Sequence, residues 1–133
     1  MASPPRGYFL AQAQAARQVL DEVTFERLDV GEQRAIWELR GVFGGADIHI
    51  KEVFNQSGRM YAYYVVRAGR LVAGFDNYPD RRALQMNYGA DFRRHLGALL
   101  PHRHGADKDA LSLTVEMDVQ AFLVALADIV QIR

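Results

Sequence analysis

The chain has 133 residues, 50% of them hydrophobic and 24% charged, which predicts a single domain spanning residues 1–133. The 16 Lys and Arg balance the 16 Asp and Glu, so the formal net charge of zero excludes a global positive field that would attract nucleic acid. No cysteine is present, which excludes disulfides, thiolate metal ligands and a cysteine nucleophile.

Two features argue against a secreted or membrane protein. Residues 1–6 lack the apolar core of a signal peptide. The longest apolar run, residues 121–127, is too short to cross a bilayer. We therefore expect a cytoplasmic protein with no membrane partner.

An N-terminal helix is predicted over residues 7–22. Phe9, Ala13 and Ala16 recur at helical spacing, and the segment is rich in the helix formers Ala and Gln. The Ser3–Pro5 segment precedes it, and proline is tolerated in the first turn of a helix. Such a helix has an apolar stripe with which to cover a sheet.

The middle of the chain alternates apolar and polar side chains between short turns, which is typical of an antiparallel meander. The runs with strand character are residues 25–30, 33–43, 48–54, 60–67, 71–75 and 111–116. The alternation places Ile50 and Glu52 on one face of their strand and Lys51 on the other. Trp37 is predicted to lie in the core.

The C-terminal segment predicts a last helix over residues 119–130, with Asp118 as its N-cap. Residues 81–100 are compatible with either a short helix or a long loop. Together the elements predict an α+β fold: a curved antiparallel β-meander of five to six strands with an N-terminal and a C-terminal helix. The helices would cover one face of the sheet and leave the other face available to a partner.

The segment Pro101–Gly105 concentrates titratable side chains. On an extended backbone His102 and His104 point the same way, and Arg103 points away from them. With His95, three of the chain's four histidines fall between residues 95 and 104. Histidine exchanges protons near neutral pH and is a common metal ligand, so we expect a site here.

One interpretation of this cluster is acid–base cleavage of RNA. One imidazole of the pair His102 and His104 would take the proton of the 2′-hydroxyl, and the other would protonate the leaving oxygen. Either Glu52 or Asp76 would orient an imidazole, as the third group of a catalytic triad does. The arginines predicted to contact the phosphate are Arg81, Arg82 and Arg94.

Other interpretations of the same residues stay open. The histidine pair, joined by His95 or Asp76, would suit a zinc-like ion, but no helical metal-ligand motif supports this and we rank it below acid–base chemistry. A solvated loop without function is the plainest alternative. The Gly41–Gly45 stretch lacks the spacing of a phosphate loop. We expect neither a cofactor nor a bound metal in this protein.

The tyrosines of the run 60–67 divide between the two faces of their strand. Tyr61 and Tyr63 share one face, and Tyr64 opposes them. Aromatic rows on an open sheet can stack nucleic-acid bases, whereas rows in a core pack against one another. We favour packing for Tyr64 and retain Tyr61 and Tyr63 as candidate substrate-binding residues.

Several of these elements follow one another in a fixed order: Glu52, Tyr61-x-Tyr63, Asp76-Asn77-x-Pro79 and Pro101-His102-x-His104. This order resembles the TumE-like family of small bacterial toxin–antitoxin proteins, over roughly the C-terminal two-thirds of the chain. In that family a Tyr-x-Tyr strand leads to an Asp-Asn-x-Pro-His-His turn, a Pro-His-His-x-His strand and a C-terminal helix. Here Asp80 and Arg81 replace the first pair of histidines, and residues 82–100 form a longer insert.

The resemblance implies a cytosolic toxin that is bound by a helix-turn-helix antitoxin and interferes with RNA or translation. Our first hypothesis is therefore a toxin component that acts as a metal-independent ribonuclease through a histidine pair. The alternative is a non-catalytic protein-binding or dimerisation module of a bacterial regulatory or defence system. Such a module would form a homodimer through an open sheet edge.

Overall fold

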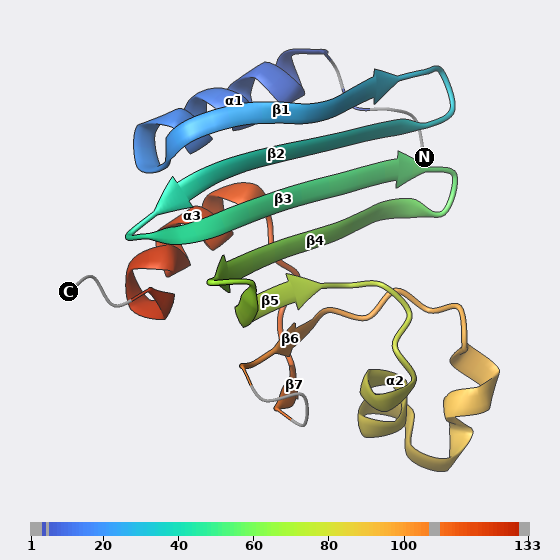
Figure 1. Ribbon diagram of the computed structural model, residues 1–133. Helices are drawn as coiled ribbons and strands as arrows, with labels where there is room; N and C mark the ends of the chain where they lie inside the picture. Colours follow the sequence, from blue (N-terminus) through green and yellow to red (C-terminus); the bar gives the residue numbers. More distant parts are fainter. Residues whose placement is uncertain (1–3, 5, 107–109, 131–133) are drawn as a thin grey trace.

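The computed structural model describes residue 4, residues 6–106 and residues 110–130. In this part of the chain, seven strands form one antiparallel sheet in which each strand pairs with the next (Figure 1). The strands are β1 (Asp21–Val30), β2 (Ala35–Phe43), β3 (Ala46–Asn55), β4 (Gly58–Arg67), β5 (Arg70–Asp76), β6 (His102–His104) and β7 (Leu111–Leu113). The predicted α+β meander is confirmed.

The number of strands exceeds the predicted five to six because one strand, β6, is not among the predicted runs. It has 3 residues, too few for an alternating pattern to stand out in the sequence. β6 pairs with β5, and β7 pairs with β6, so the two strands extend the sheet at the edge opposite β1. The predicted strand 111–116 ends at Leu113.

Two helices cover the same face of the sheet. They are α1 (Arg6–Val19) and α3 (Val119–Ile129), and both lie behind the sheet in Figure 1. The predicted cap of α3 is confirmed, because the Asp118 carboxylate accepts a hydrogen bond from the N–H of Ala121 at 2.7 Å. We call the opposite side of the sheet, which faces the viewer in Figure 1, the open face.

α1 is shorter than the predicted helix over residues 7–22. It ends at Val19, because the β-branched and aromatic side chains that follow favour an extended strand, and β1 begins at Asp21. Of the predicted helix start Ser3–Pro5, only Pro4 lies within the described residues. Among the described helices, none combines the length and the apolar character needed to cross a bilayer.

The core fills the space between the helices and the sheet. Its largest fully buried side chains come mainly from β2, β3, β4 and α3: Trp37, Leu39, Ile48, Ile50, Tyr61, Tyr63, Phe122 and Leu126. Burial of apolar surface stabilises the fold by roughly 25 cal/mol per Å². The core location of Trp37 is confirmed, and the strand faces follow the predicted alternation.

The segment that the sequence left undecided is helical over most of its length. It begins with α2 (Arg81–Tyr88) and continues as a 3₁₀ helix, η1 (Gly89–His95). The Asp80 carboxylate caps α2 by accepting a hydrogen bond from the N–H of Ala83 at 2.9 Å. Figure 1 places this pair of helices beyond the end of β5, outside the two layers formed by the sheet, α1 and α3.

Candidate functional site

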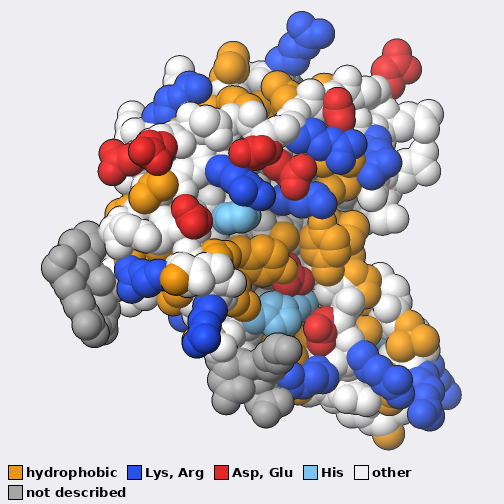
Figure 2. All heavy atoms as spheres, in the orientation of Figure 1, with side chains coloured by type: hydrophobic (Ala, Val, Ile, Leu, Met, Phe, Trp, Pro, Cys, Tyr) orange, Lys and Arg blue, Asp and Glu red, His pale blue; other side chains and the backbone are white. Residues whose placement is uncertain are grey.

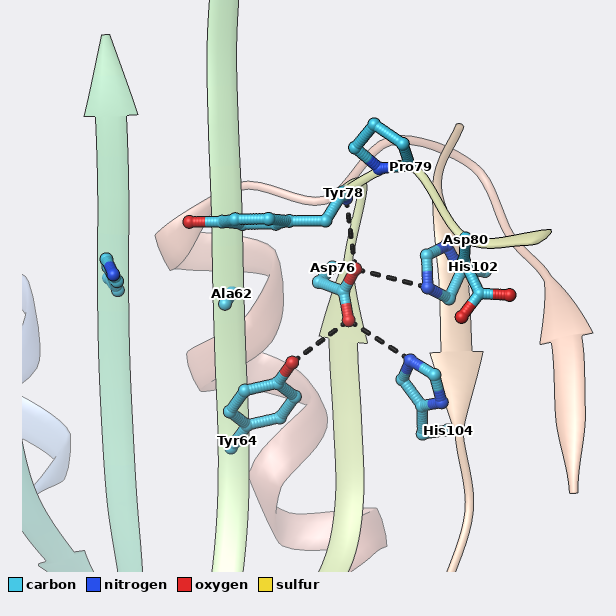
Figure 3. A pocket seen from close by; sticks show the side chains of 9 residues that line it. Ala62, Tyr64, Asp76, Tyr78, Pro79, Asp80, His102 and His104 are labelled. Atoms are coloured by element: carbon cyan, nitrogen blue, oxygen red, sulfur yellow. Dashed lines mark hydrogen bonds and ion pairs between the residues drawn. The ribbon is translucent and has the colours of Figure 1, made fainter. Parts of the chain in front are cut away.

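Strand pairing brings three titratable side chains together at the end of β5. Asp76, the last residue of β5, pairs with His102, and Gly74 pairs with His104. Side chains two apart on a strand share a face, so Asp76 and both imidazoles project from the open face (Figure 3). The predicted common direction of His102 and His104 is confirmed. Arg103 points to the other face, where its guanidinium lies 5.1 Å from the ring centroid of Phe75.

A single carboxylate bridges the two imidazoles. The Nε2 of His102 lies 3.1 Å from Oδ1 of Asp76, and the Nε2 of His104 lies 3.1 Å from Oδ2 (Figure 3). The two rings are nearly perpendicular, at 81°, with centroids 4.8 Å apart. Each imidazole therefore meets one oxygen of the same carboxyl group.

Two further donors hold the Asp76 carboxylate. The Tyr64 hydroxyl donates to Oδ2 at 3.0 Å, and the backbone N–H of Tyr78 donates to Oδ1 at 3.0 Å. Burial alone would raise the pKa of Asp76, which is 4% exposed, but His102, Tyr64 and Tyr78 together lower it. Burial and the adjacent carboxylate raise the pKa of Tyr64, so this hydroxyl stays protonated and donates.

His102 is the buried member of the pair, with 1% of its surface exposed. Its Nδ1 lies 2.7 Å from the carbonyl oxygen of Leu100, and because a carbonyl only accepts, Nδ1 carries the hydrogen. Its Nε2 lies near Asp76 without the alignment of a hydrogen bond, so this buried atom has no hydrogen-bond partner among the described residues. Burial opposes protonation, yet Asp76 and the Leu100 carbonyl outweigh it and raise the pKa of His102.

His104 is the member of the pair that meets solvent. Its side chain is 29% exposed and borders a pocket of about 430 Å³ on the open face. The pocket is lined by Lys51, Ala62, Tyr64, Asp76, Tyr78, Pro79, Asp80, His102 and His104. Histidine side chains are visible at the surface of this face in Figure 2. A ligand in the pocket can therefore reach His104 and the edge of the carboxylate.

The hollow continues across the sheet toward β1. A second cavity of about 320 Å³ shares Lys51, Ala62 and Tyr64 with the first. Its charges are mixed, because Arg40 faces Glu26 at 3.8 Å. Lys51 is thus the cation placed at the junction of the two cavities.

The three arginines predicted to bind phosphate lie outside this pocket. Arg81, Arg82 and Arg94 are exposed on α2 and η1, and none of them belongs to the described lining. Asp80 both lines the pocket and caps α2, so the arginine-rich segment begins directly beside the site. Figure 2 shows Lys and Arg side chains gathered at the lower right, over this segment.

Glu52, the other candidate for orienting an imidazole, lies on the opposite face of the sheet and contacts neither histidine. It is 0% exposed, under the helices. Its carboxylate accepts hydrogen bonds from Tyr8 at 2.6 Å, Trp37 at 2.9 Å, Tyr63 at 2.7 Å and Arg59 at 2.7 Å. The alternation of β3 had already grouped Glu52 with Ile50, and that grouping excludes it from the histidine site.

The tyrosines exchange the roles expected for them. Tyr61 and Tyr63 are 0% exposed and stack at 4.9 Å between ring centroids, so they pack in the core and are not available to bases. Tyr64, expected to pack, instead reaches Asp76. Tyr64 pairs with Gly74, and a Cβ at residue 74 would overlap the Tyr64 ring. Because glycine has no side chain, the ring can lie across β5 and reach Asp76.

Sequence reasoning also missed Lys51, Tyr78 and Asp80 as site residues. The sequence could have predicted Lys51, because it lies on the opposite strand face from the buried Ile50 and therefore on the open face. Tyr78 contributes a backbone N–H, which the sequence does not distinguish. His95, the other proposed metal ligand, stacks on Tyr88 at 3.7 Å between ring centroids and is not part of the described pocket lining.

The arrangement supports two kinds of chemistry. An imidazole oriented by a carboxylate and open to a pocket can exchange a proton with a bound substrate. The donor atoms of Asp76, His102 and His104 also lie within 4.8 Å of one another, which suits a metal ion.

No family model, curated protein or solved structure matches the chain, so the site is interpreted from its own chemistry.

Proposed function

We propose that the chain is the toxin component of a toxin–antitoxin system and cleaves RNA at the pocket on the open face. One observation carries the proposal: a buried carboxylate, Asp76, lies within 3.1 Å of two imidazoles, and one of them, His104, borders a pocket on the open face. The motif order from Glu52 to His104, which resembles the TumE-like family, supplies the biological setting. A helix-turn-helix antitoxin would be the protein partner.

The proposed chemistry is attack of a ribose 2′-oxygen on the adjacent phosphorus. A bond forms between the 2′-oxygen and phosphorus, the bond from phosphorus to the 5′-oxygen breaks, and the leaving 5′-oxygen takes a proton from solvent at the open side of the pocket. The Nε2 of His104 faces the carboxylate, so its hydrogen is donated to Asp76 and Nδ1 is left to accept the 2′-hydroxyl proton. Asp76 thereby plays the orienting role that the acid of a catalytic triad plays.

The remaining site residues would stabilise charge and position the chain. His102, held between the Leu100 carbonyl and Asp76, is too deeply buried to reach substrate, so it does not serve as the second proton-transfer group and instead helps to position the carboxylate. Lys51 offers a cation to the phosphate inside the pocket. The exposed arginines would bind the flanking RNA backbone: Arg81, Arg82 and Arg94.

The test uses expression in bacteria followed by assays of the purified protein. Wild type should arrest growth and degrade total RNA, and His104→Ala should lose both effects. His95→Ala is the matched control, because this histidine stacks on Tyr88 away from the pocket, and it should behave as wild type. Unchanged toxicity in His104→Ala, with the fold verified by circular dichroism, would refute the proposal. Co-expression with a neighbouring helix-turn-helix gene should restore growth.

A second candidate function, a non-catalytic module that dimerises, is favoured by the outer edge of β1. Within the sheet that the structure describes, this strand pairs on one side only, with β2, and it exposes Leu28 at 49% and Val30 at 47%. Unpaired strand edges with apolar side chains are templates for pairing with another chain. Light scattering separates the candidates: a stable dimer that Leu28→Lys dissociates, with no effect of His104→Ala on growth, would favour the module.

A further inference from the structure

Three metal-ligating atoms converge on the open face. The Nε2 atoms of His102 and His104 each lie 3.1 Å from a carboxylate oxygen of Asp76, and all three residues offer a ligand atom within 4.8 Å of the others. In a tetrahedral site with bonds of about 2.0–2.1 Å, neighbouring ligand atoms are roughly 3.3 Å apart. Each imidazole nitrogen therefore already lies at about this spacing from one oxygen of the carboxylate, and the three residues can each supply one ligand atom within 4.8 Å of the others.

The surroundings of His102 are those of a metal ligand. A ligating histidine usually donates its second ring N–H to a backbone carbonyl or carboxylate, which fixes the tautomer. Here Nδ1 donates to the Leu100 carbonyl at 2.7 Å, which directs the lone pair of the neutral ring to Nε2. That Nε2 is buried, points at the cluster and lacks a hydrogen-bond partner among the described residues.

The carboxylate is supported in the same way. Tyr64 and the backbone N–H of Tyr78 each hold one oxygen of Asp76 at 3.0 Å, so the group is oriented before any ligand arrives. On the remaining side lies the pocket, which has room for water or an anion as a further ligand. Three protein ligands with one open position are the pattern of an accessible metal site.

We infer that Asp76, His102 and His104 form a binding site for a divalent transition-metal ion of the Zn²⁺ class. Two imidazole nitrogens and one carboxylate suit Zn²⁺, Co²⁺ or Fe²⁺, whereas Mg²⁺ and Ca²⁺ prefer oxygen ligands alone. An ion on Nε2 of His104 moves the ring hydrogen to Nδ1, which then cannot accept a proton. Bound metal and proton transfer therefore exclude each other, a consequence that rests on the proposed function.

The experiment titrates EDTA-treated, dialysed protein with ZnCl₂ by calorimetry and with CoCl₂ by visible absorption. Wild type should bind one equivalent, and Co²⁺ should show the spectrum of nitrogen and oxygen ligation. His104→Ala should lose this binding, while His95→Ala should retain it. Tyr64→Phe, which removes support from Asp76 but no ligand, should weaken Zn²⁺ binding by about 10–100-fold. His104 is the ligand to replace because its side chain is 29% exposed, so the substitution leaves the core intact.

The outcomes separate this inference from the proposed function. Absence of Zn²⁺ binding by wild type, or equal binding by wild type and His104→Ala, overturns the metal site. Cleavage of single-stranded RNA by the metal-free protein is assayed independently, and its failure would refute the proposed function while metal binding stands. Where both hold, Zn²⁺ should suppress cleavage over the concentrations at which it fills the site. Cleavage that continues in the filled site overturns the mutual exclusion.

Discussion

The two faces of one sheet each carry a buried carboxylate, and the two differ in how their partners are arranged. Glu52, beneath the helices, receives hydrogen bonds from three aromatic side chains and from the guanidinium of Arg59. Asp76, on the open face, receives one hydroxyl and one backbone N–H and contacts two imidazoles. Both side chains are nearly inaccessible, at 0% and 4% exposed.

The two clusters differ in how readily the partners of the carboxylate exchange protons. The partners of Glu52 are tyrosine, tryptophan and arginine, whose protons do not leave near neutral pH, and burial with the adjacent Glu52 raises the pKa of Tyr63 further. The partners of Asp76 include imidazoles, which exchange protons in that range. One of those imidazoles borders a pocket, and Nε2 of the other, 3.1 Å from Asp76, has no hydrogen-bond partner among the described residues. We therefore propose a stabilising role for the first cluster and a chemical role for the second.

The largest stability effect is expected from Glu52→Ala. Removal of this carboxylate leaves the guanidinium of Arg59, 16% exposed, with the exposed Glu116 at 3.4 Å in place of the buried partner at 2.7 Å, and leaves three aromatic donors without their acceptor. Loss of one partner of a buried ion pair costs about 3–5 kcal/mol. Urea denaturation should show this loss, whereas Glu26→Ala, at a surface pair 3.8 Å apart, should change stability by less than about 0.5 kcal/mol. A similar small change for both would mean that the Glu52 cluster is not structural.

A smaller effect, on both stability and the site, is expected from Gly74→Ala. The added methyl group would occupy the space of the Tyr64 ring, and overpacking of this kind costs about 1–3 kcal/mol. A displaced Tyr64 can no longer donate to Asp76, so Zn²⁺ affinity should fall as it does in Tyr64→Phe. Unfolding curves and Zn²⁺ titrations measure the two effects. Normal Zn²⁺ affinity would show that Tyr64 does not support the carboxylate.

A matched pair of substitutions removes one hydroxyl from each cluster. Tyr63→Phe deletes the donor 2.7 Å from Glu52 inside the core, and should cost about 1.5–3 kcal/mol because the acceptor is charged and inaccessible to water. Tyr64→Phe deletes the donor 3.0 Å from Asp76 beside the pocket, where water can replace it, and should cost about 0.5–1.5 kcal/mol. Denaturant midpoints of the two variants measure these losses of stability. Equal losses would show that the two carboxylate clusters do not differ in this way.

The smallest effect concerns His49, which shares the open face with Asp76. Burial first, and then the neighbouring Arg40, lower the pKa of His49, in contrast to the raised pKa of His102. The folded state thus binds this proton less well than the unfolded state does. His49 contributes stability above its ordinary pKa of about 6.5, and the contribution is lost as the pH falls through the lowered value. An NMR titration should show the low pKa, and Arg40→Gln should raise it partway; no change would exclude Arg40 as a cause.

Much of the fold follows from short-range patterns. Alternation assigned the faces of β2, β3 and β4 correctly, and Asp118 marked the start of α3. The extended Pro101–Gly105 segment correctly placed His102 and His104 on one side. Residues 81–100 remained undecided because their apolar spacing fits a helix only over short stretches, and α2 has 8 residues.

The site itself was only partly predictable. Asp76 and His104 are 28 residues apart and meet through the pairing of β5 with a strand of 3 residues, which no local pattern specifies. Glu52 was a candidate only because its distance from the histidines was unknown, although its place beside Ile50 pointed to the core face. Tyr64 was assigned to packing because nothing in the sequence relates it to Gly74, the residue whose missing side chain lets its ring cross β5.

The most direct measurement compares RNA cleavage by Asp76→Asn and Glu52→Gln, each isosteric with the residue it replaces, under conditions where both variants are folded. We expect Asp76→Asn to lower the cleavage rate by about 10²–10⁴-fold, the usual contribution of a positioned acid–base system, and Glu52→Gln to retain the wild-type rate. Wild-type cleavage by Asp76→Asn, or loss of cleavage in folded Glu52→Gln, would contradict the assignment of chemistry to the open face.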